Sequence, residues 1–523
     1  MAQRKKRKAR ASATAPADET PEQCVIVDRP TGDKGAAMLL RGDLPWWHDL
    51  ISSAIFSPML GRQRAVFTNR TLRLDRVKAV GFDFDHTLGV YHCEALDSLA
   101  MRLVIDRLIQ FEGVDASFVR DLPDPSFARK GLVIDLKLGN VLKTDRFGHV
   151  KRAYHGKTPL VPEDRRRHYG KIDVIPHVTQ GQRFIQSDSA FAHPEVLIFA
   201  ALAPRMPDGD CTKLWKTIRE HTDCVHRDGS LKKIITASPL DYIRPDKSTI
   251  ALLHHLRKGG KKVFLLTNSE WEYTQAMMNP ALGVGVGAGL EWLDLFDTVV
   301  VEARKPKYFN DARPGEPVVD VGPCHVVRGG HIERLEQSLA AAGPEILYVG
   351  DHIYSDLITS KRKQNWRTML ILSELEEELK LQSVLPGMSH QLHKTDELRW
   401  DTEREVQHWK AIEAALARLP RNDHGPLLQE FRKVCAHNRR QAAQALNQHI
   451  QQRERLRSKL SHVTNRYWGS LFRAGNELTY YGRQLEDFAC TYTSRATNLG
   501  LYPTDHYFRS AMDYLPHEFE ALR

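Results

Sequence analysis

Two pairs of aspartates follow apolar stretches of this chain. Asp83 and Asp85 come after "VKAVGF", and Asp351 and Asp356 come after "EILYVG". Clustered acids without matching basic residues repel one another and raise each other's pKa values, so such a site needs a cation. Magnesium is the expected ion, because it prefers hard oxygen ligands and shares its coordination shell with substrate phosphates. The aspartates are therefore candidates for a magnesium site.

With a cation present, these side chains can divide the work of phosphoryl transfer. Asp83 can attack phosphorus and become an aspartyl-phosphate. Asp85 lies on the same side of an extended chain and can protonate the leaving oxygen and later activate water. Thr267 and Asn268, after "KKVFLL", can hold phosphate oxygens, and Lys305 in "EARKPKYF" can balance the charge of the transferred group.

Three short apolar runs must bring these residues together. "VKAVGFDFD", "KKVFLLTNS" and "EILYVGDH" lack polar alternation and read as buried strands of a parallel sheet. The stretch "STIALLHHLRKGG" predicts a helix that ends at Gly259 and Gly260, just before the second strand. This alternation is typical of a doubly wound α/β fold, in which ligands bind at the carboxyl ends of the strands. A single Asp-x-Asp or "TNS" is a weak signal, whereas all of them in chain order after strands indicate one site.

Composition bounds the class of protein. The chain has 523 residues and a net charge of +10, and six basic residues lie among the first ten. A basic tail of this kind is expected to be disordered, with contacts to RNA or an acidic partner as the alternative. Elsewhere nucleic-acid binding is not expected. We find no apolar run long enough to cross a membrane and no apolar signal sequence, so a cytoplasmic protein is expected. The seven scattered cysteines form no CxxC pair, which favours reduced thiols.

The length predicts more than one domain. An insertion between the first two strands is too long for a simple crossover and is expected to form a cap that selects the substrate. Later amphipathic helices are interpreted as ordinary packing, with a contact between copies as the alternative; a homo-oligomer is expected. The predicted parts are a tail (1–23), an α/β core (24–95 and 235–375), the cap (96–234), long helices (376–462) and a C-terminal segment that packs back on the core (463–523).

The residues also carry a family resemblance. "DFDHTL", "LLTNS", "RKP" and "GDHIYSD" resemble the four motifs of haloacid-dehalogenase-superfamily (HAD) phosphatases. Longer stretches, such as "RKGLVIDLKLGNVLKTDRFGHV" and "LYVGDHIYSDLITSKRKQNWRTMLIL", resemble the cytosolic purine 5′-nucleotidase branch. This resemblance implies a HAD-like core with a cap. It also implies magnesium-dependent hydrolysis of nucleoside 5′-monophosphates such as IMP and GMP, and in some members transfer of the phosphoryl group to another nucleoside.

The resemblance assigns roles to the motif residues. It implies that Asp83 is the nucleophile and Asp85 the acid/base. Magnesium would be bound by the Asp83 carboxylate, the Asp85 backbone carbonyl and the Asp351 side chain, with Asp356 supporting both the metal shell and Lys305. The implied phosphate-binding residues are Thr267, Asn268 and Lys305.

Residues of the insertion resemble the family's nucleoside-binding stretches. Arginine and lysine can donate to a purine 6-oxo group, aspartate can accept from a base or sugar, and an aromatic ring can stack on the base. The chain departs from the usual pattern at Ala192, where asparagine is common, and at His86, which replaces a tyrosine and is expected to face away from phosphorus. A polar helix face is the alternative interpretation. The candidates are Phe191, Arg219, Asp223, His226 and Lys232.

Three functions fit these observations. The first is a nucleotide phosphohydrolase. The second is the same chemistry on another phosphomonoester, because the motifs set the reaction while the cap sets the selectivity. The third is an inactive scaffold that holds a nucleotide, RNA or a partner. The presence of every motif residue argues against the scaffold.

Overall fold

The computed structural model describes residues 62–174, 183–206, 210–287, 289–311, 314–321, 324–384, 386–418, 425–511 and 518. The predicted basic tail and the expected start of the core at residues 24–61 lie outside these ranges. Among the described helices, none is both long enough and apolar enough to cross a membrane.

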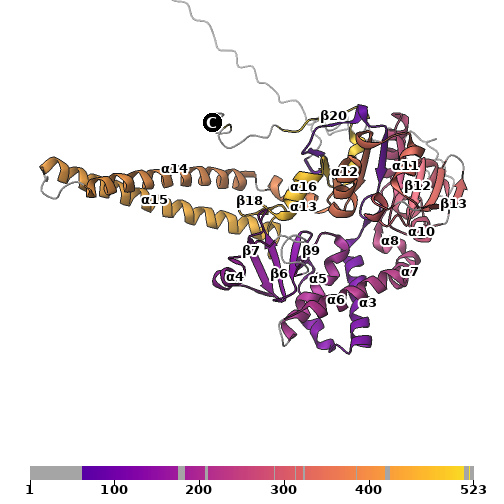
Figure 1. Cartoon of the computed structure of the whole chain (residues 1–523), viewed down its shortest axis with the longest axis horizontal. Coiled ribbons are helices and arrows are strands. Elements are labelled where there is room, and N and C mark those ends of the chain that lie inside the picture. The colour runs from indigo at the N-terminus through magenta and orange to yellow at the C-terminus, as the bar shows by residue number, and fades with distance from the viewer. Residues whose placement is uncertain are drawn as a thin grey trace, which may run out of the picture.

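A nine-stranded sheet forms the centre of the molecule (Figure 1). The strand β3 (Ala79–Phe82) lies in the middle and pairs in parallel with β11 (Lys262–Leu266) and β15 (Ile346–Gly350). Only the edge strands β1 and β13 run antiparallel to their neighbours. The other strands are β1 (Phe67–Thr68), β12 (Thr298–Val301), β13 (Gly315–Val321), β14 (Cys324–Gly329), β16 (Arg367–Ile371) and β19 (Thr491–Thr493), in the order β1-β19-β16-β15-β3-β11-β12-β14-β13. The predicted mostly parallel α/β sheet is confirmed.

Side chains of β3 point into two separate cores, as expected for a sheet covered on both faces. Val80 and Phe82 belong to one hydrophobic cluster, whereas Ala79 belongs to another that includes Phe264. Gly81 faces the Phe264 ring so closely that a Cβ atom there would lie 2.1 Å from it. The Phe264 ring thus packs directly over β3, and this position requires glycine.

Helices fill the connections between the strands. The predicted helix before β11 is α9 (Ser248–Lys258), which ends at Gly259, and Gly260 has a φ of 76°. That left-handed conformation suits glycine and turns the chain into β11. The other connecting helices are α10 (Trp271–Leu282), α11 (Ile332–Leu339) and α12 (Thr359–Gln364).

The insertion forms a second unit with its own sheet, which lies below the central sheet in Figure 1. Strands β4 (Val90–Tyr91) and β10 (Ile243–Arg244) pair antiparallel and make its stem. The unit contains an antiparallel sheet in the order β8-β7-β6-β5-β9. Its elements are α3 (Cys93–Glu112), β5 (Leu132–Asp135), β6 (Asn140–Thr144), β7 (Val150–His155), β8 (Thr158–Pro159), α4 (Pro162–Tyr169), β9 (Phe184–Ser187), α5 (His193–Leu202), α6 (Thr212–Arg227), α7 (Ser230–Ala237) and α8 (Pro239–Tyr242). The division into domains at the predicted residue numbers stays a prediction.

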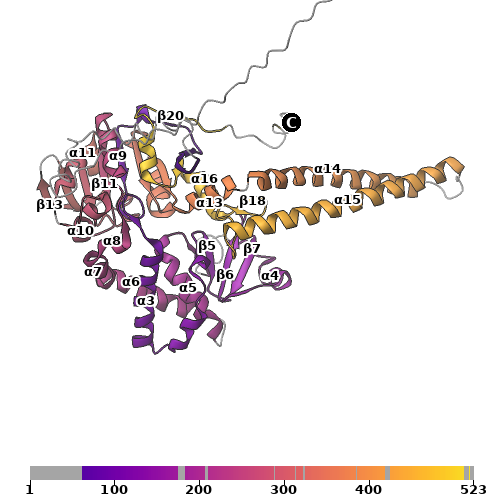
Figure 2. The ribbon, with the colours of Figure 1, turned by 180° about the vertical axis from the view of Figure 1, so that it is seen from behind.

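The long helices project from the body as an antiparallel pair, visible from both sides (Figures 1 and 2). After α13 (Glu374–Val384), α14 (Pro386–Ala417) leads outward and α15 (Pro426–Thr464) returns. Val406 and Cys435 are buried, whereas Trp400 and Phe431 are exposed. Packing between the two helices thus accounts for part of their apolar surface, and the expected homo-oligomer stays a prediction.

The C-terminal segment returns to the core. Its strand β19 lies between β16 and β1 of the central sheet, and β20 (Tyr507–Phe508) pairs with β2 (Leu72–Arg73). Between α15 and β19 lie a short hairpin, β17 (Arg473–Ala474) and β18 (Glu477–Leu478), and the helix α16 (Tyr480–Phe488). The segment supplies part of the sheet in addition to packing against it.

Candidate active site

The predicted catalytic residues meet because their strands are neighbours. Asp83 directly follows β3, Thr267 follows β11 and Asp351 follows β15. The backbone N–H of Asp83 donates to the Val349 carbonyl at 2.9 Å, which extends the pairing of β3 and β15 to the site. The carboxyl ends of three adjacent parallel strands thus build one edge, where open α/β sheets bind their ligands.

Three buried carboxylates gather at this edge. Asp83, Asp351 and Asp356 each offer one oxygen, and these oxygens lie within 4.8 Å of one another. Burial raises the pKa of Asp83 well above the ordinary aspartate value; Lys305 opposes the rise, and the charges of Asp356, Asp85 and Asp351 add to it. A compact set of hard oxygen donors that repel one another fits a divalent cation such as magnesium.

Lys305 bridges two of these aspartates. Its Nζ lies 3.0 Å from Asp83 Oδ2 and 2.8 Å from Asp356 Oδ1, and it donates to the Tyr348 hydroxyl at 2.8 Å. Burial lowers the pKa of Lys305, but Asp356 and Asp83 outweigh burial and leave that pKa raised. The backbone N–H of His352 donates to the second Asp356 oxygen at 3.1 Å. Asp356 is thus held by protein groups on both oxygens, as a supporting residue would be.

The two predicted phosphate-binding residues of the second motif lie next to Lys305. Asn268 Oδ1 accepts from the backbone N–H of Lys305 at 2.6 Å, and its Nδ2 donates to the Lys305 carbonyl at 3.3 Å. Thr267 is buried, and its hydroxyl accepts from the N–H of Ser269 at 3.1 Å. Asn268 therefore fixes the backbone of Lys305, a positioning contact that sequence reasoning did not anticipate. Direct phosphate contacts of Thr267 and Asn268 stay predictions.

Asp85 is held by hydroxyl groups that the sequence analysis missed. The Tyr91 hydroxyl donates to Asp85 Oδ1 at 2.6 Å, and the Ser269 hydroxyl donates to Oδ2 at 2.6 Å. Tyr91 also lies 2.8 Å from the hydroxyl of Tyr273 on α10. Ser269 is the last residue of "TNS" and could have been included with that motif, but no local pattern marks the two tyrosines.

The insertion brings an aromatic ring to the first motif. The Phe191 ring meets the His86 ring edge-on at 4.8 Å between centroids and the His226 ring at 5.8 Å. Burial is the main cause that lowers the pKa of His226, and the charge of Lys232 adds to it. His86 follows the end of β3 by four residues and has a φ of 55°, in the left-handed region. The His86 side chain therefore packs against the predicted base-binding residue of the insertion.

The three other candidate residues of the insertion, Arg219, Asp223 and Lys232, already have partners. Arg219 Nη1 donates to Glu195 Oε2 at 3.1 Å, and Arg219 Nε lies 3.6 Å from Asp223 Oδ1. Lys232 Nζ donates to Glu270 Oε2 at 2.7 Å, which links α7 to the residue just before α10. Burial raises the pKa of Glu195 to about 7, with Arg219 opposing the rise. Sequence reasoning missed both glutamates.

Comparison with known proteins agrees with this architecture. The profile of the 5′ nucleotidase family matches residues 66–520. A 5′-nucleotidase domain-containing protein of Dictyostelium discoideum is 28% identical over 475 residues, covering 87% of this chain and 75% of its own length. The 5′-nucleotidase domain-containing protein 2 of Rattus norvegicus is 27% identical over 495 residues, covering 90% and 82%. Because the family match takes in the central sheet, the insertion and the long helices, the chain belongs to the 5′ nucleotidase family and is a hydrolase of the 5′-nucleotidase type.

Proposed function

We propose that this protein is a magnesium-dependent 5′-nucleotidase that hydrolyses purine nucleoside 5′-monophosphates, such as IMP and GMP, through an aspartyl-phosphate on Asp83. The observation that carries the proposal is the trio of buried carboxylates with Lys305 Nζ only 3.0 Å from Asp83 Oδ2. This arrangement suits an in-line attack on a dianionic phosphate, because the positive charges of Lys305 and of a bound magnesium ion would balance the negative charge on the oxygens of the transferred group.

The reaction takes two steps. An oxygen of Asp83 attacks phosphorus, the bond from phosphorus to O5′ breaks, and Asp85 gives a proton to O5′. Water then attacks phosphorus and gives a proton to Asp85, while the bond from phosphorus to Asp83 breaks and phosphate leaves. Tyr91 and Ser269 keep the Asp85 carboxyl group in position for both proton transfers.

Asp83, Asp351 and the backbone carbonyl of Asp85 would hold the magnesium ion. When bound, magnesium supplies positive charge that offsets the repulsion between the carboxylates and the phosphate. Asp356 would hold Lys305 in place through the 2.8 Å ion pair. Lys305 would then contact a phosphate oxygen beside the nucleophile.

Purine selection would lie with the insertion. The edge contact between Phe191 and His86 supports a base-binding position for Phe191 close to the first motif. Arg219, Asp223 and Lys232 offer donors and an acceptor that match a 6-oxopurine and its ribose. Ala192 lacks the amide usual at its position, so the ranking of IMP and GMP is a property to measure.

The test is phosphate release from IMP, GMP, AMP, CMP, UMP and sugar phosphates, with magnesium and with a chelator. The proposal predicts magnesium-dependent release that is fastest with a purine nucleotide and is abolished by Asp351→Asn. Faster turnover of a sugar phosphate would indicate that the substrate is another phosphomonoester and not a nucleotide. Absence of release from every substrate would favour the scaffold. Adding inosine as acceptor with GMP as the phosphoryl donor, and measuring IMP, tests for phosphoryl transfer.

A further inference from the structure

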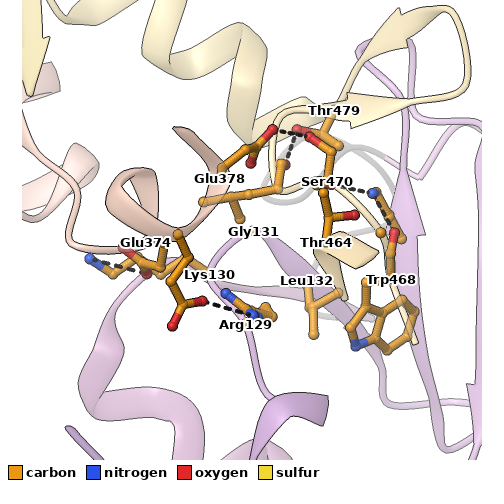
Figure 3. Close-up of a pocket in the computed structure, with 14 residues that line it drawn as sticks. Arg129, Lys130, Gly131, Leu132, Glu374, Glu378, Thr464, Trp468, Ser470 and Thr479 are labelled. Carbon is orange, nitrogen blue, oxygen red and sulfur yellow. Dashed lines mark hydrogen bonds and ion pairs between the residues drawn. The ribbon is translucent and has the colours of Figure 1, made fainter. Parts of the chain in front are cut away.

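A lysine from the insertion, far earlier in the chain than Lys305, also reaches the carboxylate site. Lys130 lies just ahead of β5, and its side chain is only 3% exposed. Its Nζ donates to Asp351 Oδ2 at 3.2 Å. It also lies 3.9 Å from Glu374 Oε1, and Figure 3 labels both Lys130 and Glu374. In the described part of the chain, this is the only ion pair that Asp351 makes with a lysine or arginine.

The surroundings of Lys130 form a junction of three segments. Glu374 is the first residue of α13, and the neighbouring Arg129 lies 3.9 Å from Glu377 of the same helix. Glu378 accepts from the Ser470 hydroxyl of the C-terminal segment at 2.6 Å. The pocket between these groups has a volume of about 30 Å³, room for a water molecule and far too little for a nucleotide. The cluster therefore joins three segments of the protein.

Lys130 and Lys305 form ion pairs with different aspartates of the site. Lys305 comes from the core and contacts Asp83 and Asp356, whereas Lys130 comes from the insertion and contacts Asp351. Each lysine engages one named oxygen of an aspartate that would bind magnesium. The orientation of a ligand carboxylate depends on such outer contacts, and losing one typically weakens metal binding 10- to 100-fold.

We propose that Lys130 is a positioning residue that orients Asp351 for magnesium and ties the metal site to the insertion and to α13. The inference rests on the proposed magnesium site. Without Lys130, the buried Asp351 and the partly buried Glu374 would be two carboxylates around the space that one ammonium group had filled, and they would repel each other. The positive charge of Lys130 repels a magnesium ion, but this repulsion does not outweigh the benefit. The site has more carboxyl groups than lysines, since Lys130 and Lys305 face Asp83, Asp85, Asp351, Asp356 and Glu374.

The test is calorimetric titration of magnesium chloride into the full-length, metal-free protein without substrate. Lys130→Met is expected to weaken magnesium binding about 10- to 100-fold, and Lys130→Arg to restore it to within a few-fold of the wild type. Arg129→Met is the matched control, because the adjacent Arg129 pairs only loosely with the exposed Glu377; its affinity should equal that of the wild type. In activity assays the magnesium requirement of Lys130→Met should rise, with kcat at saturating magnesium largely kept.

Asp351→Asn separates this inference from the magnesium site itself. If Asp351→Asn loses magnesium but Lys130→Met binds it as tightly as the wild type, the positioning role is overturned while the site stands. If Asp351→Asn binds like the wild type, the proposed site and the role of Lys130 both fall. Should Lys130→Met not fold, the double variant Lys130→Met/Glu374→Gln removes one unpaired carboxylate and carries the same prediction.

Discussion

The catalytic edge of the central sheet and the nucleoside face of the insertion handle charge in opposite ways. At the catalytic edge, Lys305 and Asp356 have side chains that are 1% and 0% exposed and pair with each other. On the insertion, Arg219 and Asp223 are about half exposed, at 53% and 50%. Exposed pairs contribute about 0–1 kcal/mol, whereas buried pairs are held firmly because breaking one leaves an uncompensated charge.

This difference separates reaction from recognition. The groups that would act on phosphorus are placed by strand ends and by contacts with one another, so their geometry exists before a substrate arrives. The groups that would read the base pair with Glu195 and Glu270, and each pair includes a side chain that solvent reaches, at 53% exposure for Arg219 and 44% for Glu270. A nucleotide can replace these pairs at modest cost, so we expect substitutions at the edge to lower kcat and substitutions on the insertion to raise KM.

The largest expected effect is that of Asp83→Asn. An amide cannot attack phosphorus, so kcat should fall by at least about 10⁴-fold, as is typical when a covalent nucleophile is removed. Steady-state phosphate release with IMP measures the change, and circular dichroism checks the fold. Turnover equal to that of the wild type would rule out the covalent route.

Asp85→Asn should have the next largest effect. Loss of a general acid costs roughly 10²–10⁴-fold in kcat, because the leaving O5′ oxygen would depart without a proton. An aryl phosphate, whose leaving oxygen needs no proton, serves as the control substrate. Release of the leaving alcohol in the first turnover, measured by rapid quench, should be much less impaired on the aryl phosphate, and an equal first-turnover loss on both substrates would remove Asp85 from the role of acid.

Lys232→Ala tests the other side of the comparison. If Lys232 leaves Glu270 to contact the base, KM for IMP and GMP should rise about tenfold with kcat nearly unchanged, since a charged hydrogen bond contributes about 1.5–3 kcal/mol. The adjacent, exposed Lys233 provides the matched control as Lys233→Ala. Unchanged KM and kcat in Lys232→Ala would take this residue out of the substrate site.

The smallest expected effect concerns Glu195. Its pKa is raised from 4.5 to about 7, so the side chain is ionised and holds Arg219 only above about pH 7. Glu195→Gln removes the competing carboxylate and should tighten nucleotide binding by about threefold at pH 8. At pH 6 the wild-type glutamate is already largely protonated, and the two proteins should bind alike. Affinities measured at both pH values check this sign, and weaker binding at pH 8 would show that Glu195 orients Arg219 for the substrate.

The catalytic edge could be predicted from the sequence, because the motif residues there come after apolar strands. Once β3, β11 and β15 pair in parallel, Asp83, Thr267 and Asp351 must meet, so the three middle strands of the central sheet and their polar edge were predictable. The strand β19 was not, since three residues contain no periodic pattern and their place beside β16 depends on the folded core.

Contacts between distant segments escaped prediction for a related reason. Lys130 is 221 residues from Asp351, and no local spacing connects them. Ser269 and Tyr91 reach Asp85 only through the arrangement of side chains in three dimensions. His86 was expected to face away from phosphorus; its ring contacts Phe191, because the packing of the insertion brings that ring to the first motif.

The most direct test of the account is to find the phosphoryl group on the protein. Wild-type protein is mixed with IMP and magnesium, quenched in acid within the first turnover, digested and analysed by mass spectrometry. An aspartyl-phosphate mechanism places phosphate on the peptide that carries Asp83, and none in Asp83→Asn or when magnesium is chelated. Rapid IMP hydrolysis with no phosphorylated aspartate at any time within the first turnover would contradict it, since water would then attack phosphorus directly.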